Sequence, residues 1–172
     1  MKRIAAFLIA ISACRAAPVA TPTSALTPAH SAAIADSVSA TLGEYRAAFA
    51  ARDIDATMRF YADDPRFRWV EDGELRYSSK AEVAAALRAF VPSLKAIELS
   101  YYDPVVTPLA PGVAVVATRF AQKITDSAGV MRGFAGAMSM TLIHGDSGWR
   151  FLVGHTSSLV PRPPTATKQG AG

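Results

Sequence analysis

The last third of the chain consists of three long strand-like segments separated only by short turns. Apolar and polar residues alternate over residues 113–126, 130–144 and 149–160, which is the two-residue period of a β-strand with one buried face. The connections at 127–129 and 145–148 contain glycine and have the length of hairpin loops. Strands of about a dozen residues are longer than usual, and long strands bend. The sequence therefore predicts a curved antiparallel sheet that can leave a hollow at one end.

Helical patterns precede this sheet. Apolar residues recur every three or four positions over residues 32–51, as on one face of an amphipathic helix. Asp53 can cap a second, short helix, which ends before Pro65.

A hairpin and a third helix come next. The dipeptide Asp72–Gly73 suits a tight hairpin turn. Ser79 and Glu82 form a capping box that opens the third helix, and a strand is expected over residues 95–102. Helices grouped before one antiparallel sheet favour an α+β fold rather than an α/β fold.

The first residues have the character of an export signal. Lys2 and Arg3 precede the apolar run 4–11, which is too short to span a membrane as a helix. The segment "ISAC" at 11–14 resembles the lipobox of bacterial lipoproteins, in which the cysteine is acylated and becomes the mature N-terminus. The resemblance implies lipidation at Cys14, the only cysteine in the chain.

The expected organisation follows from composition. Residues 1–13 are assigned to the signal peptide, 14–30 to the lipidated cysteine and a flexible Ala/Thr/Pro linker, 31–160 to one folded domain, and 161–172 to a disordered tail. We expect an exported protein of the bacterial cell envelope that faces the periplasm and is held to the membrane through Cys14. The alternative is an ordinary secretory signal cleaved after Ala16 or Ala17, which would release a soluble exported protein.

The charge of the chain argues against a nucleic-acid partner. The formal net charge is +4, but residues 31–160 contain 13 basic and 14 acidic residues, a net charge of −1. The positive excess therefore lies in the ends of the chain. Without a basic face on the domain, binding to phosphates is not expected.

Taken in order, these features resemble the NTF2-like superfamily and its SnoaL-like branch. The residues that carry the resemblance are "YADD" at 61–64, "EDG" at 71–73, "SSKAEV" at 78–83 and "GWRFLVGHTSS" at 148–158, within a region of about 32–160. The resemblance implies a cone, with three N-terminal helices packed in a curved, mainly antiparallel sheet around a pocket. Members include ketosteroid isomerase, polyketide cyclases, dehydratases and non-catalytic binding or dimerising domains, so the fold alone does not choose a function.

The turns predict which side chains face this pocket. If Gly129 takes the left-handed position of a three-residue loop, Thr118 lies opposite Met138 and Phe120 opposite Gly136. If His144 opposes Trp149, then His155 lies opposite Met138. A slip of one residue would turn every side chain of the last strand to the other face, and its large apolar residues favour the first register. Thr118, Met138 and His155 are thus expected in one row on the concave face.

Three roles are compatible with His155 at that position. It can be a core or rim histidine that bonds a backbone carbonyl, a residue that lines the pocket, or a general acid or base, for which its ordinary pKa is suitable. Glu71 shares a face with Trp69. The resemblance to ketosteroid isomerase implies that Glu71 or Asp72 could act as a general base, although a turn and solvation explain both residues equally well.

These considerations lead to one expected function and one alternative. The first is binding of a small hydrophobic molecule, or service as a dimerising accessory domain. The alternative is a general acid/base enzyme of the isomerase, cyclase or dehydratase type that uses His155 and Glu71. The expected ligand-binding residues are Tyr61, Trp69, Tyr77, Thr118, Phe120, Met138 and His155.

The sequence indicates neither a metal site nor a cofactor site. The resemblance does imply a partner, namely a second copy of the chain. His30, His144 and His155 have no metal-ligand spacing, and no phosphate loop, dinucleotide fingerprint or nucleophile elbow is found, so neither a metal nor a cofactor is expected. The outer sheet face carries small and polar residues over 133–141. Superfamily members often dimerise through such faces, which implies a homodimer.

Overall fold

The computed structural model describes residues 25–159. The expected signal peptide, Cys14 and C-terminal tail lie outside the described residues. In chain order the elements are the helices α1 (Pro28–Ala50) and α2 (Ile54–Met58), the strands β1 (Arg68–Glu71) and β2 (Glu74–Tyr77), the helix α3 (Lys80–Phe90), a 3-10 turn η1 (Val91–Ser93), and the strands β3 (Leu94–Ala110), β4 (Val113–Asp126), β5 (Met131–Gly145) and β6 (Gly148–Ser158).

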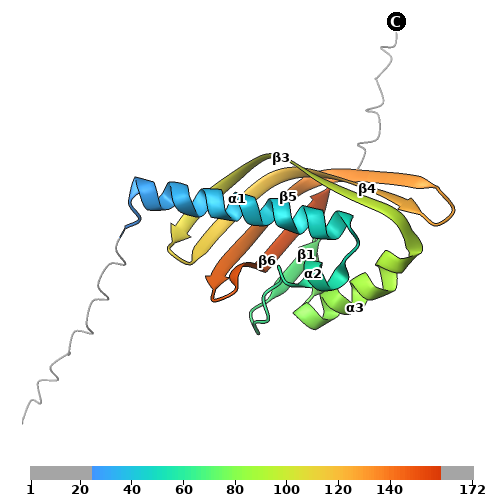
Figure 1. The fold of residues 1–172 in the computed structure, drawn as a ribbon, viewed down its shortest axis with the longest axis horizontal. Helices are drawn as coiled ribbons and strands as arrows, with labels where there is room; N and C mark the ends of the chain where they lie inside the picture. The colour runs from blue at the N-terminus through green and yellow to red at the C-terminus, as the bar shows by residue number, and fades with distance from the viewer. Residues whose placement is uncertain (1–24, 160–172) are drawn as a thin grey trace, which may run out of the picture.

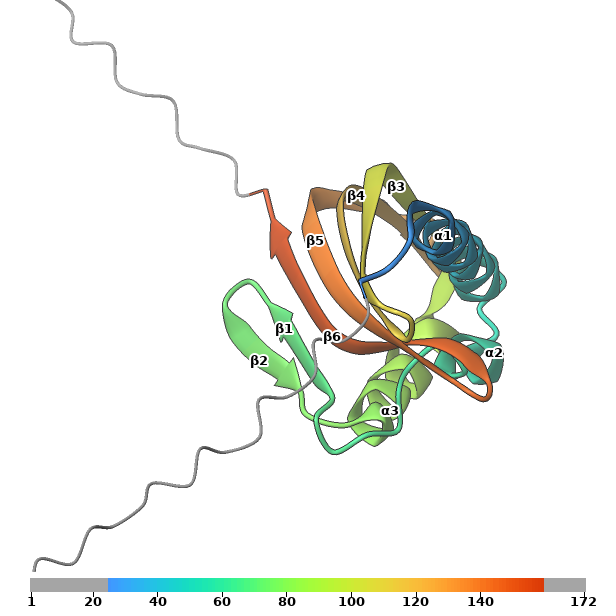
Figure 2. The ribbon, with the colours of Figure 1, turned by 90° about the vertical axis from the view of Figure 1, so that its left-hand side faces the viewer.

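The described strands form one curved sheet in the order β2-β1-β6-β5-β4-β3. All neighbours pair antiparallel except β1 and β6, which are parallel. Figures 1 and 2 show α1 lying along the sheet and α3 beside its lower end, so the helices occupy the concave side. The α+β class and the mainly antiparallel, curved sheet are confirmed. The three N-terminal helices are matched only in part: α1 and α3 are long, α2 has only five residues, and the 3-10 turn η1 follows α3.

Helix α1 begins earlier than the apolar pattern predicts. The Oγ1 atom of Thr27 accepts the N–H of His30 at 3.2 Å, and Pro28 occupies the first turn. A capping threonine followed by proline is a favourable helix start, so the helix takes in three residues expected to belong to the linker. Its buried face carries Val38, Leu42, Tyr45 and Phe49, as the spacing predicts. Within residues 25–159, no helix is both long and apolar enough to cross a membrane.

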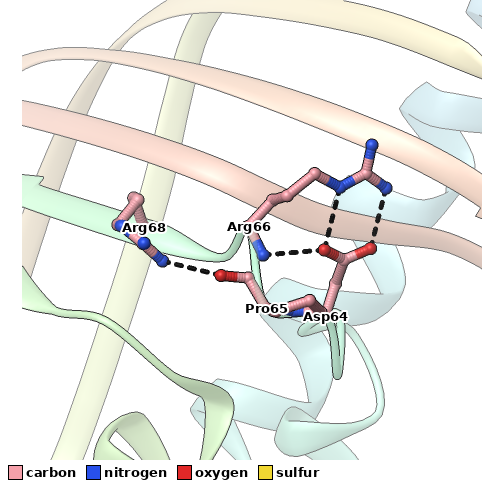
Figure 3. A network of polar contacts seen from close by, with 4 residues as sticks. All are labelled: Asp64, Pro65, Arg66 and Arg68. Carbon is pink, nitrogen blue, oxygen red and sulfur yellow. Dashed lines mark hydrogen bonds and ion pairs between the residues drawn. The ribbon is translucent and has the colours of Figure 1, made fainter.

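A charged turn leads the chain from α2 into β1. The carboxylate of Asp64 accepts the backbone N–H of Arg66 at 2.8 Å and its guanidinium N–H groups at 2.9 and 2.8 Å, while Arg68 donates to the carbonyl of Pro65 at 3.0 Å (Figure 3). These hydrogen bonds from Arg66 lower the pKa of Asp64 to about 2. The turn ends where β1 begins, and Trp69 of β1 is buried in the core.

Two turns have the conformations that their residues predict. Asp72 and Gly73 have φ values of 51° and 89°, as a two-residue hairpin turn requires. Gly129 has a φ of 85°, and the Asp126 N–H donates to the carbonyl of Val130 at 3.1 Å. The predicted register of β4 and β5 is therefore confirmed: Thr118 pairs with Met138 and Phe120 with Gly136.

The register predicted for β5 and β6 is confirmed from the turn to Phe151 and is wrong beyond it. Leu142 pairs with Phe151 as predicted, but Thr141 pairs with Val153, so that Leu152 is an extra residue in β6. A bulge of this kind reverses the alternation of everything that follows. His155 accordingly pairs with Ser139 and is exposed on the outer sheet face, while Thr156 pairs with Met138.

Contacts from distant segments explain this bulge. On the edge of β6 that faces away from β5, Phe151 donates its N–H to the carbonyl of Phe60 at 2.8 Å and its carbonyl accepts the N–H of Ala62 at 2.9 Å. Its pairing with Leu142 of β5 fixes it on the other edge. Further along, Gly154 pairs with Trp69 of β1. A Cβ on Gly154 would overlap the six-membered ring of Trp69. The inward position is therefore one that only glycine fits, and the bulge places Gly154 there.

Strand β3 continues beyond Tyr102, where the sequence predicted its end. Asp103 takes a positive φ of 52° within an irregularity between Tyr102 and Val105, after which pairing with β4 resumes. The hydroxyl of Thr118 lies 3.0 Å from the carbonyl oxygen of Tyr102. The bulge leaves Pro104 without a partner in β4, which suits a residue that has no N–H to donate to the ladder.

Candidate functional site

A cavity of about 620 Å³ lies between α3, the β1–β2 hairpin and the concave face of the sheet. Its position follows from the curvature of the strands, which keeps α3 away from the sheet at this end. The wall is mainly aromatic and aliphatic. Charged side chains come from the β1–β2 hairpin, and other polar side chains come from Gln122 of β4, the end of β6 and the tyrosines. The lining residues are Tyr45, Phe49, Tyr61, Trp69, Glu71, Asp72, Arg76, Tyr77, Val83, Ala86, Leu87, Phe90, Leu99, Phe120, Gln122, Phe134, Met138, Thr156 and Ser158.

One end of the wall is a cluster of aromatic rings. Tyr61 packs against Trp69 at 5.8 Å and against Phe151 at 5.6 Å between ring centroids, and Tyr45 meets Phe151 edge-on at 5.0 Å. Edge-to-face and tilted pairs at these distances are the favoured arrangements for aromatic rings. The cluster is therefore a rigid apolar wall.

Two tyrosine hydroxyls meet inside this wall. The oxygens of Tyr45 and Tyr61 lie 2.9 Å apart in a buried position. Burial raises the pKa of Tyr45 to about 12, and it also raises the pKa of Tyr61, so both side chains are neutral. Two hydroxyls joined by one hydrogen bond use one of their two protons for it. The other O–H can donate to an oxygen of a bound molecule.

Glu71 is the half-buried acid of the cavity. Its carboxylate oxygen lies 3.8 Å from Nε of Arg76, and burial raises the pKa of the carboxyl although Arg76 acts in the opposite direction. A carboxylate whose pKa is raised binds a proton more strongly than an exposed glutamate does, so it is the better general base. Glu71 and the two tyrosines line the same cavity, so an acid/base group and a hydroxyl donor could act on one molecule.

The hairpin turn is fastened to the end of β6 at the cavity edge. The carboxylate of Asp72 accepts the N–H of Ser158 at 2.6 Å and lies 3.2 Å from its hydroxyl, and the Asp72 N–H donates to the carbonyl of Thr156 at 2.9 Å. Asp72 therefore positions the turn, and Glu71 is the carboxylate that remains for a ligand.

The cavity brings together most of the residues predicted from the sequence. Tyr61, Trp69, Tyr77, Phe120 and Met138 line it, as does Glu71. The predicted ligand-binding role of these residues stays a prediction.

Two predicted residues do not line the cavity. Thr118 points inward, but its hydroxyl lies within hydrogen-bond distance of the carbonyls of Tyr102 and Arg119. His155 faces the opposite side of the sheet, because the bulge of β6 reverses its direction. There it lines a separate hollow of about 420 Å³ with Ser139, Ser157 and other residues. The expectation that His155 faces the cavity is therefore wrong.

Several lining residues were missed by the sequence analysis. Tyr45 lies on the predicted apolar face of α1, and nothing in that pattern distinguishes a cavity residue from a core residue. Thr156 enters the cavity only because of the bulge. Leu87 and Phe90 lie on α3, and the curvature of the sheet leaves space in front of them. Within residues 25–159, no three His, Cys, Asp or Glu side chains are grouped so that they could hold a metal ion.

Comparison with known proteins agrees with the architecture. A model of the SnoaL-like domain matches residues 38–162. Similar solved structures include an NTF2-like superfamily protein from Salmonella enterica serovar Typhimurium, with 12% identity and a TM-score of 0.66 over 81% of this chain and 99% of that chain. A candidate dehydratase of the NTF2-like family from Streptomyces avermitilis has 14% identity and a TM-score of 0.66 over 75% and 98%.

A third similar structure is a ketosteroid isomerase-like protein from Erwinia carotovora, with 22% identity and a TM-score of 0.59 over 73% of this chain and 96% of that chain. At these identities the likeness shows the fold, which is NTF2-like. A comparison with curated protein sequences found no match.

Proposed function

Because the chain belongs to the SnoaL-like domain family, we propose that its cavity binds a small, mainly apolar molecule that carries a polar group at one end. The observation that carries this proposal is the cavity of about 620 Å³, with an aromatic wall and with Glu71, Arg76 and the Tyr45–Tyr61 pair among its polar groups. Ligand sites are typically apolar hollows of this size with a few placed polar groups.

Two neighbouring alanines of α3 provide the test. Ala86 lines the cavity, whereas Ala85 is exposed. The full chain should enhance the fluorescence of the apolar probe N-phenyl-1-naphthylamine, and Ala86→Trp should weaken binding at least tenfold by filling the cavity. Ala85→Trp should bind like the unmodified chain. Equal affinities for the two variants would contradict the proposal.

A second candidate function is general acid/base catalysis on a carbonyl compound. Glu71 and the Tyr45–Tyr61 hydroxyls line one cavity, and burial raises the pKa of Glu71. In this function Glu71 removes a proton from the carbon next to the carbonyl, while a tyrosine hydroxyl donates to the carbonyl oxygen. Deuterium exchange from heavy water into a cyclic ketone, followed by NMR, measures this step. Glu71→Gln should abolish the exchange; exchange at the unchanged rate would exclude Glu71 as the base.

We also propose that the protein is exported and anchored to the cell envelope through Cys14. The support is the sequence alone: a basic start, a short apolar run and a lipobox-like "ISAC". Metabolic labelling with a palmitate analogue should label the protein, and Cys14→Ser should remove the label. Unaltered labelling of that variant would refute lipidation at Cys14.

The outer sheet face is proposed to hold a second copy of the chain. Ala137 and Ser139 are exposed there among small and polar neighbours, which lets two sheets approach closely. Sedimentation analysis should show a dimer for the full chain and a monomer for Ala137→Arg. Ala85→Arg, on exposed α3, is the matched control and should remain dimeric. A dimer that persists in Ala137→Arg would contradict this interface.

A further inference from the structure

Large apolar side chains are exposed along one edge of the cavity. Phe90 at the end of α3 is 42% exposed, Val130 and Met131 at the β4–β5 turn are 50% and 67% exposed, and Phe134 on β5 is 43% exposed. We refer to these four residues as the mouth rim. Phe90 and Phe134 also line the cavity, so these two residues of the mouth rim continue the apolar wall outward. Met131 pairs with Thr125 three positions before Phe134, so it projects from the other face of the same hairpin, beside the turn. Contiguous exposed apolar surface commonly marks an interaction site.

The mouth rim is held together although it comes from three elements. The N–H of Ser127 donates to the carbonyl of Ser93 at 3.1 Å, and Leu94 pairs with Asp126. The β4–β5 turn is thereby fixed to the segment that follows Phe90. Figure 1 shows this hairpin reaching beyond the other strands at its end of the sheet, where a flat surface could contact it.

Basic side chains lie at the same end of the sheet as the mouth rim. Lys95, Lys123 and Arg132 are exposed at this end of the sheet, and none of them forms an ion pair with another described residue. Two acids are nearby: Glu98 lies opposite Lys123 in the backbone register of β3 and β4, and Asp126 accepts a backbone N–H of the turn at 2.9 Å. The surroundings therefore have a small positive excess, which suits an anionic surface.

We propose that the mouth rim inserts into the surface of an anionic lipid bilayer and that the cavity receives its ligand from that bilayer. Apolar side chains flanked by bases favour the boundary between headgroups and acyl chains, where each kind of group meets its complement. An apolar molecule that moves from the bilayer along Phe90 and Phe134 reaches the cavity without crossing water. The source of the ligand rests on the proposed function, whereas the membrane contact stands without it.

A fluorescent label at a single cysteine tests the insertion at its own position. In the full chain with Cys14→Ser, Met131→Cys is labelled with the environment-sensitive dye NBD and mixed with phosphatidylcholine–phosphatidylglycerol vesicles. Leu109→Cys is the matched control, because Leu109 is 60% exposed and lies at the opposite end of β4, by the β3–β4 turn. We expect a several-fold gain of emission at position 131, quenched by a quencher within the acyl chains, and little change at position 109.

The outcomes separate this inference from the proposed function. Equal responses at positions 131 and 109 would show that another part of the chain holds the vesicle, and no response at either position would show no contact; both overturn the proposal. A label at position 131 that is shielded before vesicles are added, and unchanged by them, would indicate a protein partner and would also overturn it. Binding of N-phenyl-1-naphthylamine without vesicles tests the cavity independently.

Discussion

The indole ring of Trp69 covers the backbone of Gly154, its partner in the parallel pairing of β1 and β6. A methyl group at position 154 would overlap three atoms of the ring, so the contact depends on the absence of a side chain. The same ring forms part of the aromatic wall of the cavity. One pair of residues therefore couples the path of β6 to the shape of the site.

Gly154→Ala should destabilise the protein. Overpacking of a filled core costs about 1–3 kcal/mol, and here the backbone and the Trp69 ring must both shift. Gly43→Ala is the control: Gly43 lies within α1, and a Cβ there meets nothing within 4 Å. That change should stabilise the protein by about 0.5–1 kcal/mol. Urea unfolding measures both, and equal stabilities of the two variants would contradict the contact.

Neighbouring residues of β6 should differ in their effect on binding. Thr156→Trp should weaken binding of N-phenyl-1-naphthylamine, because Thr156 lines the cavity. His155→Trp should leave it unchanged, because His155 is exposed on the outer face. Fluorescence titration of both variants checks the orientation of the strand. Weaker binding for His155→Trp alone would favour the register without a bulge.

Tyr45 and Tyr61 should be energetically coupled through the hydrogen bond between their hydroxyls. Tyr45→Phe removes one partner and leaves the hydroxyl of Tyr61 buried alone, which costs about 1–3 kcal/mol. Tyr61→Phe should have a similar cost. The double variant leaves neither of these two positions with an unpaired hydroxyl, so its loss of unfolding free energy should be smaller than the two single losses together. Additive losses in a urea-unfolding cycle would show that the 2.9 Å contact contributes nothing.

Alkaline pH should destabilise the protein through Tyr45. Its pKa is about 12 in the folded protein, against an ordinary value of 10.0. Below pH 10 the group is protonated in both states. Above pH 10 the unfolded chain releases this proton first, so stability falls as the pH rises, by about 1.4 kcal/mol at one pH unit above the ordinary value. Unfolding free energies between pH 8 and pH 11 should therefore decline less steeply for Tyr45→Phe, and identical slopes would refute this assignment.

Glu71→Gln should stabilise the protein at neutral pH. Burial raises the pKa of Glu71 above the ordinary 4.5, so the folded state holds this proton more strongly than the unfolded chain. The ionised carboxylate thus disfavours folding above pH 4.5, and the penalty disappears below it. Melting temperatures at several pH values should show a gain for Glu71→Gln at pH 7 that vanishes in acid. Glu74→Gln, at an exposed position on β2, is the control; an equal gain there would contradict a specific effect of Glu71.

Local chemistry made much of the fold predictable. Asp72–Gly73 and Gly129 can take positive φ values at little cost, so each sets the register of the strands beside it. Asp53 caps α2 by accepting the N–H of Ala56 at 2.8 Å, and the Oγ of Ser79 accepts the N–H of Glu82 at 3.3 Å at the start of α3. Each feature depends only on residues within a few positions of one another, so it can be predicted from a short stretch of sequence.

The candidate site depended on contacts that no short stretch contains. The alternation of Phe151, Val153 and His155 predicts one face for all three, yet Val153 and His155 are exposed and Phe151 is buried. The carbonyl of Phe60 accepts the N–H of Phe151, and the ring of Trp69 leaves room only for glycine at position 154. Both partners come from segments more than 80 residues away in the chain.

The sequence by itself determined the class of fold, the helix faces, the turns and the register of β4 with β5, because these follow from interactions between near neighbours. Only the tertiary structure decided that β6 bulges at Leu152, that His155 leaves the cavity and that Thr156 enters it. The physical reason is that a bulge adds one residue at small local cost, so the packing of Trp69 and Phe60 from elsewhere in the chain chooses its position.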